Sequence, residues 1–240
     1  MDKRVPVPVL RQHRKGTWRW PSSSLLCSLD QASRERLLAA GTTKQYPAGQ
    51  VLVREGDSSN FVIILLDGVV KATGVTSDGK EALLAIRVGG DIVGEFAALD
   101  DRPRSATLIT CGVVVGCMIK QADFLTVLKR DPAMAHAVNR SILAKMRAAD
   151  ERRMDFAGYE APIRLARVLR ELAVRYGDQS DSRVKISWPL TQPELASLAA
   201  VAEPTAHKVL RKLRESGVIA TGYRSLTVLD LTELDRIAGV

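Results

Sequence analysis

The chain has 240 residues, of which 46% are hydrophobic and 26% charged, and its formal net charge is +8. This length allows two modest domains with hydrophobic cores, and the composition is typical of a globular protein. No apolar run is long enough to span a membrane, and no secretory signal follows the basic N-terminus, so we expect a cytoplasmic protein without a membrane partner. The three cysteines are too widely spaced for a metal or cluster motif, and we expect no metal site.

Residues 1–20 carry six Lys or Arg and one acid, so most of the excess positive charge lies there. The high net charge alone is therefore no argument for nucleic-acid binding. Prolines and charges predict that residues 1–24 form a flexible basic tail. Its tryptophans, Trp18 and Trp20, either pack on the body or belong to a basic arm that touches DNA phosphates or a partner.

The next segment begins with a short helix over 28–40, which ends at Gly41. Short apolar runs separated by Gly, Asp and Ser turns then predict strands at 50–53, 61–66, 69–73, 82–88, 106–110 and 113–119. This spacing is typical of an antiparallel β-roll or sandwich, and we assign residues 25–130 to this domain.

The stretch Val93–Thr107 has the composition of a phosphate-binding loop inside this roll. Arg104 offers a guanidinium fork and Ser105 a hydroxyl donor, and the short apolar turn after Glu95 offers backbone N–H groups. Glu95 would repel a phosphate, so we expect it to accept from a sugar hydroxyl. The alternative is a surface loop with a solvated Glu–Arg pair.

This pattern resembles the pocket of the cyclic-AMP receptor protein/Fnr (Crp-Fnr) family of bacterial transcription regulators, and the resemblance runs from about Leu25 to the C-terminus. It implies that Glu95 holds the ribose 2′-hydroxyl and that Arg104 and Ser105 hold the cyclic phosphate. The allosteric ligand would be cyclic AMP or cyclic GMP, with no cofactor. The expected ligand-binding residues are Gly94, Glu95, Phe96, Ala97, Arg104, Ser105, Ala106, Lys145, Ala149 and Asp150.

A short helix over 121–129 precedes a long helix over 131–158. Apolar residues that recur every three, four or seven positions predict a coiled-coil seam on the long helix. They are Ala135, Val138, Ile142, Ala149 and Phe156, with Lys145 and Arg152 as interruptions. The resemblance makes this helix the homodimer interface and the lid over the nucleotide base; the alternative is a helix packed on its own roll.

Two positions on this helix depart from the family pattern. The receptor has a Thr-Ser pair that contacts adenine where this chain has Ala149 and Asp150. Asp150 can accept from the N1–H and 2-amino group of guanine, so one hypothesis is a preference for cyclic GMP or another nucleotide, and the alternative is a solvated Asp150. Lys145 stands where the family often has an arginine, and it can pair with Glu95 as a point charge.

Residues 159–240 predict a winged helix-turn-helix. An amphipathic helix over 161–176 leads to a polar loop at 179–182 and a strand at 184–188. Thr191 and Glu194 form a capping box at the start of the next helix, and a second helix covers 203–216 before a β-wing at 218–229. The turn between the two helices has Ala200 where the family usually has Gly.

The base-reading face differs from that of the family, because Glu203 and Pro204 occupy positions that commonly hold an Arg and a Glu. We expect Lys208 to read guanine, and Thr205, Arg211 and Lys212 to hold phosphates. The expected DNA-binding residues are Thr191, Gln192, Glu203, Thr205, His207, Lys208, Arg211 and Lys212. We therefore predict that the usual TGTGA-type half-site is not recognised.

The sequence thus predicts an α+β protein composed of a cyclic-nucleotide-binding β-roll, a dimerisation helix and a winged helix-turn-helix. Its function would be that of a homodimeric regulator that binds double-stranded DNA and contacts RNA polymerase. The alternatives are a nucleotide- or partner-binding protein with weak or atypical DNA recognition, or a ligand-independent regulator. We expect no enzyme, because none of the three histidines has a plausible catalytic partner, and no iron–sulfur sensor, because the N-terminal cysteine cluster is missing.

Overall fold

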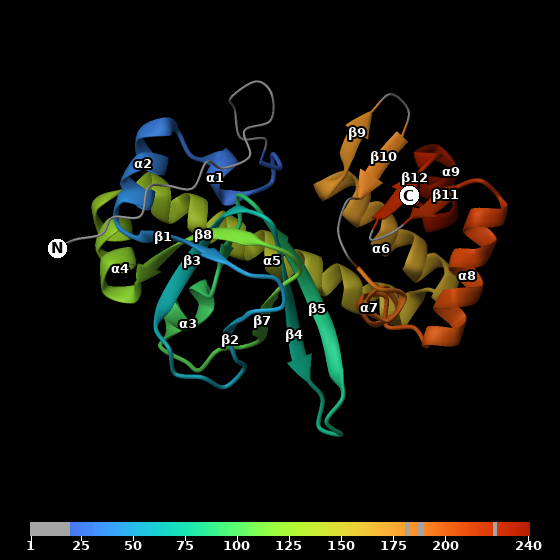
Figure 1. Cartoon of the computed structure of the whole chain (residues 1–240), viewed down its shortest axis with the longest axis horizontal. Helices are drawn as coiled ribbons and strands as arrows, with labels where there is room; N and C mark the ends of the chain where they lie inside the picture. The colour runs from blue at the N-terminus through green and yellow to red at the C-terminus, as the bar shows by residue number, and fades with distance from the viewer. Residues whose placement is uncertain (1–19, 181–182, 187–189, 223–224) are drawn as a thin grey trace.

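The structure is a computed structural model that describes residues 20–180, 183–186, 190–222 and 225–240. Figure 1 shows a β-roll with helices along one side, a smaller winged domain, and the long helix α5 running between them. The expected α+β architecture is confirmed, and so is the order of roll, long helix and helix-turn-helix. In the part of the chain described, no helix has the length and apolar character needed to cross a membrane.

Two four-stranded antiparallel sheets form the roll. One has the order β1 (Thr42–Tyr46), β8 (Val114–Lys120), β3 (Phe61–Asp67), β6 (Ile92–Val93), and the other β2 (Val51–Val53), β7 (Thr107–Thr110), β4 (Val69–Val75), β5 (Glu81–Val88). The six predicted strands are all present. Sequence patterns missed β1, whose TTKQY sequence is largely exposed, and β6, which has only two residues.

Strand β3 shows why this region has an almost continuous apolar run. Ile63 and Leu65 point into the core between the two sheets, whereas Val62, Ile64 and Leu66 belong to a second core under the helices. Successive strand residues face opposite sides, so a strand that is covered on both sides needs apolar residues at every position.

Four helices cover the outer face of the first sheet: α1 (Leu25–Ser28), α2 (Gln31–Ala39), α4 (Gln121–Arg130) and the first part of α5 (Pro132–Gly158). The predicted single helix over 28–40 is wrong in its start, because the chain forms two helices here. Asp30 accepts from the Ser33 N–H at 2.7 Å and so caps α2, which separates it from α1.

The predicted tail lies mostly outside the described residues. Its last residues pack on the roll, since Trp20 Nε1 donates to the Leu66 carbonyl at 3.0 Å and Ser24 is buried. Trp18 falls outside the described residues.

The predicted coiled-coil seam on α5 is wrong at Val138, which the roll covers, and stays a prediction for its other residues. Val138 is fully buried against the roll with Ile142 beside it, and Ala149 and Phe156 line a cavity. Phe156 is nevertheless 60% exposed, and three further exposed apolar side chains lie on a neighbouring stripe: Leu143 at 52% exposure, Met146 at 54% and Met154 at 71%. The periodicity is that of one helix face, but the roll covers part of that face.

The C-terminal domain contains the predicted winged helix-turn-helix. Its elements are α6 (Ala161–Tyr176), β9 (Asp178–Ser180), β10 (Arg183–Ile186), α7 (Gln192–Leu198), α8 (Glu203–Glu215), β11 (Ile219–Gly222), β12 (Ser225–Val228) and α9 (Leu231–Ala238). Part of the expected polar loop at 179–182 belongs instead to strand β9, which pairs with β10. Helix α9 was not predicted, and Trp188, the expected end of the strand, lies outside the described residues.

The winged domain packs directly on the roll. Leu83, Ile86 and Val88 of β5 share one buried cluster with α6, α7 and α8. The ammonium of Lys71 lies 2.8 Å from Glu194 Oε1, and the Ser197 hydroxyl accepts from the Leu83 N–H at 2.7 Å. Helix α7 therefore lies against the β4–β5 hairpin, as Figure 1 shows.

The turn between β3 and β4 supplies a test of the roll. Gly68 has φ +89°, and a Cβ there would lie 2.6 Å from the Val113 carbonyl oxygen. We expect Gly68→Ala to lower the free energy of unfolding by about 2 kcal/mol or more, because the left-handed conformation and the close contact add. The measurement is chemical denaturation followed by circular dichroism.

Gly49→Ala is the matched control. Gly49 has φ +76°, but a Cβ there would have no neighbour within 4 Å. Only the conformational cost remains, about 1–2 kcal/mol. Equal losses in the two variants would contradict the close approach at Gly68.

Candidate functional site

A cavity of about 650 Å³ lies where the roll, α5 and the helix-turn-helix meet. Its wall contains nine of the ten predicted ligand-binding residues: Gly94, Glu95, Phe96, Ala97, Arg104, Ser105, Ala106, Lys145 and Ala149. The sequence motif therefore folds around one cavity. Asp150 does not line it and is exposed on α5, so within this chain it does not face a bound base as the guanine hypothesis required.

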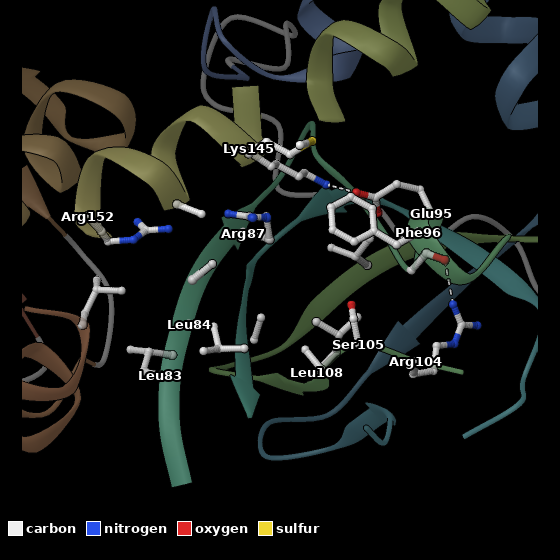
Figure 2. A pocket seen from close by; sticks show the side chains of 18 of the residues that line it. Leu83, Leu84, Arg87, Glu95, Phe96, Arg104, Ser105, Leu108, Lys145 and Arg152 are labelled. Carbon is white, nitrogen blue, oxygen red and sulfur yellow. Dashed lines mark hydrogen bonds and ion pairs between the residues drawn. The ribbon is translucent and has the colours of Figure 1, made fainter. Parts of the chain in front are cut away.

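Glu95 is the first residue of α3 (Glu95–Asp100) and is only 3% exposed. Lys145 of α5 lies 2.6 Å from Glu95 Oε1, and it also donates to the Ile92 carbonyl at 2.6 Å. The expected pairing of these two residues is confirmed. The bond joins the long helix to the floor of the cavity, as Figure 2 shows.

Two further charged residues, Arg87 and Asp91, lie near the Lys145–Glu95 pair. Burial lowers the pKa of Lys145 below its ordinary value, although the Glu95 charge opposes this shift and Arg87 adds to it. Burial raises the pKa of Asp91, and the charges of Lys145 and Arg87 oppose that shift. Arg87, Asp91, Glu95 and Lys145 thus form a cluster of two cations and two anions next to the cavity.

Arg104 is 3% exposed, and its hydrogen bonds connect three backbone segments of the roll. Its Nη1 donates to the Gly94 carbonyl and its Nη2 to the Phe61 carbonyl, both at 2.7 Å, and Nε donates to the Ser59 hydroxyl at 3.0 Å. A guanidinium has five N–H groups, so two remain for a ligand. Burial lowers the pKa of Arg104, but arginine stays charged in proteins.

Gly94 explains the Gly-Glu start of the motif. It has φ +81°, and a Cβ there would lie 2.6 Å from Arg104 Nη1. Only glycine tolerates both the left-handed backbone and the approach of the guanidinium. Ser105, by contrast, is exposed at the cavity wall, and within the described part of the chain its hydroxyl makes no hydrogen bond.

Sequence analysis missed several residues of the wall: Arg87, Arg152 and Arg153, Leu83 and Leu84, and Leu198 and Ala200. Arg87 carried a signal, because it interrupts an apolar strand between buried Ile86 and Val88. Leu198 and Ala200 carried none, because they reach the cavity only through the packing of the two domains.

The helix-turn-helix has the predicted geometry. The Thr191 hydroxyl accepts from the Glu194 N–H, and Glu194 Oε2 accepts from the Thr191 N–H at 2.8 Å, so the capping box is confirmed. Ala200 in the turn has φ +51°, the left-handed conformation for which glycine is the usual residue. The turn closes with hydrogen bonds from Ala200 N to Ser197 O and from Val201 N to Ala196 O.

Helix α8 presents a basic face to solvent. Of the predicted DNA-binding residues, Thr191, Glu203, His207, Lys208, Arg211 and Lys212 are exposed, and Gln192 and Thr205 are half-buried. Pro204 lies in the first turn of α8, as expected. Neither Glu203 nor Pro204 has a side-chain hydrogen-bond donor. The role of Glu203 in DNA recognition stays a prediction.

Comparison with known proteins gives two matching family models. One is described as the cyclic nucleotide-binding domain and matches residues 43–131, and the other as the Crp-like helix-turn-helix domain and matches residues 163–237. A CRP-like cAMP-activated global transcriptional regulator of Mycobacterium tuberculosis is 27% identical over 204 residues, which are 83% of this chain and 91% of that protein.

Two other proteins are similar. A cyclic AMP receptor protein of Thermus thermophilus is 28% identical over 194 residues, 80% of this chain and 86% of that protein. The solved structure of the c-di-GMP responsive global regulator CLP from Xanthomonas campestris has a TM-score of 0.70 at 21% identity, over 83% of this chain and 99% of that one. The latter likeness shows the fold.

The buried ion pair supplies a test of the site. Lys145→Met leaves the Glu95 carboxylate buried without a cation, so we expect the free energy of unfolding to fall by about 3 kcal/mol. The measurement is chemical denaturation at neutral pH.

The double variant Lys145→Met with Glu95→Gln is the control, because it removes the stranded charge as well. It should recover much of the loss. If the double variant is no more stable than Lys145→Met, the loss comes from packing of α5 and not from the unpaired carboxylate.

Proposed function

Because the chain belongs to the Crp-Fnr family of transcription regulators, we propose that it is a homodimer that binds cyclic AMP or cyclic GMP in the roll and responds by altering its hold on DNA. One observation carries this proposal: a single cavity has walls from the roll, from α5 and from the helix-turn-helix. A ligand in that cavity touches the nucleotide motif, the long helix and the DNA-binding unit at once. Such a ligand can favour one arrangement of the three over another.

The site chemistry fits a cyclic nucleotide. Arg104 keeps two N–H groups, and with the Ser105 hydroxyl it can hold a cyclic phosphate. Glu95 can accept from a ribose hydroxyl beside the Lys145 ammonium. The apolar walls that remain, from Leu84, Phe96 and other residues, suit a flat purine.

Dimerisation is supported by the exposed apolar stripe on α5. Leu143, Met146 and Met154 lie at spacings of three and eight on one helix and are each more than half exposed. A second copy of α5 would bury them. Two recognition helices in such a dimer would contact DNA half-sites about one helical turn apart. Contact with RNA polymerase and action in the cytoplasm of a bacterium complete the proposal.

A second candidate function follows from the start of α8. Glu203 and Pro204 are exposed where a base-reading helix normally begins, and a carboxylate there is repelled by phosphates. The protein would then be a nucleotide-binding module that acts on a protein partner, with weak or atypical DNA binding.

Isothermal titration of the whole protein with cyclic AMP and cyclic GMP tests the ligand. At least one should bind at micromolar or tighter affinity. Ser105→Ala and Arg104→Lys should each weaken that binding, Arg104→Lys by about tenfold or more, because lysine cannot replace the planar fork. Arg102→Lys, on the same loop but outside the cavity, should bind like the natural protein. Binding of neither nucleotide would contradict the proposed sensor.

Electrophoretic mobility shift with genomic DNA fragments tests the second half of the proposal. Some fragments should bind more tightly than random DNA, and the ligand should change that affinity. Lys208→Ala should lose about 1–3 kcal/mol of specific binding, as expected for a residue that reads a base edge. Lys129→Ala, an exposed lysine on α4, is the control and should bind normally. Equal binding to all fragments would favour the partner-binding function.

A further inference from the structure

Arg87 on β5 is a cation in the cavity wall that the proposed phosphate and ribose contacts do not use. Figure 2 shows it between the Lys145–Glu95 pair and Arg152, across the cavity from Arg104. Within the described ranges its side chain makes one hydrogen bond, from Nη1 to the Ile86 carbonyl of its own strand at 2.8 Å. Among the described residues it has no ion pair within 4.0 Å. Most of its five N–H groups are thus available to a ligand.

Arg87 lies at the end of the cavity that the proposed phosphate and ribose contacts leave free. If the proposed function holds, the cyclic phosphate lies at Arg104 and Ser105 and the ribose at Glu95. The base must then extend into the space that remains, which is bordered by Arg87, Met146 and other residues of β5 and α5.

The polar groups at this end are donors. Arg152 has Glu171 as its partner at 3.3 Å, and the other side chains there, from Leu84, Ala149 and Phe156, are apolar. In the whole cavity wall the side-chain acceptors are Glu95, which Lys145 already holds, and the Ser105 hydroxyl. A 6-amino group that faces Arg87 would therefore meet donors and no free side-chain acceptor, whereas a 6-carbonyl could accept from these donors.

These chemistries separate the two common purines. Adenine presents an amino group at position 6 next to N7, and guanine presents a carbonyl there. An arginine fork donates to O6 and N7 together, and this pairing is the commonest specific contact to guanine. Burying an amine without an acceptor is unfavourable, so the same wall also acts against adenine.

We propose that Arg87 is the base-selecting residue of this cavity and that it favours a 6-oxopurine cyclic nucleotide over cyclic AMP. This assignment rests on the proposed function and moves the preference for cyclic GMP from Asp150, which is exposed outside the cavity, to Arg87, which lines it. Arg87 would donate to O6 and N7 of the purine and would make no contact with the 2-amino group of guanine.

The first experiment is isothermal titration of the whole protein with cyclic AMP, cyclic GMP and cyclic IMP. Cyclic IMP keeps O6 and N7 but lacks the 2-amino group, so it separates the two ways of reading guanine. We expect cyclic GMP and cyclic IMP to bind with similar affinity, both at least about tenfold tighter than cyclic AMP, which corresponds to one good base contact.

The second experiment repeats the titrations with variants. Arg87→Met should lose the preference for the 6-oxopurines while cyclic AMP still binds, and that retained binding shows that the cavity has folded. Arg87→Lys should keep only part of the preference, because an ammonium is not a bidentate fork. Arg130→Met, an exposed arginine at the end of α4 that does not line the cavity, is the control and should bind like the natural protein.

Four results would overturn the assignment. These are equal binding of all three nucleotides, a preference for cyclic AMP, cyclic IMP binding as weakly as cyclic AMP, or an unchanged preference in Arg87→Met. Binding of none of the three would instead reject the cyclic-nucleotide sensor itself, and with it the role of Arg87.

Discussion

The buried ion pair between Lys145 and Glu95 is the contact on which the arrangement of roll, cavity and long helix depends. Removing two charges from water costs several kcal/mol per ion, so neither residue can leave the other without a replacement partner. Lys145 also holds the Ile92 carbonyl, which fixes α5 against the strand that leads into the motif. A ligand hydroxyl that reaches Glu95 enters this pairing directly. The charge state of Glu95 and the position of α5 are therefore coupled through Lys145.

A second ion pair ties the DNA-binding domain to the same roll. Glu194 caps α7 through Thr191 and also pairs with Lys71, so one carboxylate serves both the helix and the domain contact. Burial raises the pKa of Glu194, but its hydrogen bonds from Lys71 and Thr191 outweigh that effect and hold the pKa below its ordinary value. The stabilisation is complete above the ordinary carboxyl pKa and is lost as the pH falls through the lowered value. At neutral pH Glu194 is therefore ionised, and its ion pair with Lys71 helps to hold the two domains together.

Much of this organisation could be predicted from sequence because local chemistry determines it. Gly-Asp breaks mark the strands, the Thr191–Glu194 box marks α7, and the spacing from Glu95 to Ser105 marks the site. The failures have a common cause. Periodicity identified a helical face of α5 but could not show that the roll covers Val138, which leaves a neighbouring stripe exposed. Likewise, Asp150 was assigned to the ligand because it aligns with one residue of the family's Thr-Ser pair, although only Ala149 of the two lines the cavity.

Ala200 belongs both to the cavity wall and to the turn of the helix-turn-helix. It lines the cavity, and it also forms the turn of the helix-turn-helix in a left-handed conformation that costs an alanine about 1–2 kcal/mol. Two backbone hydrogen bonds hold the turn in that conformation. Helix α8 begins three residues later at Glu203, so a ligand atom that presses on Ala200 acts on the backbone that orients the recognition helix. The cavity and the orientation of α8 are thus connected through one short turn, besides the longer connection through Lys145 and α5.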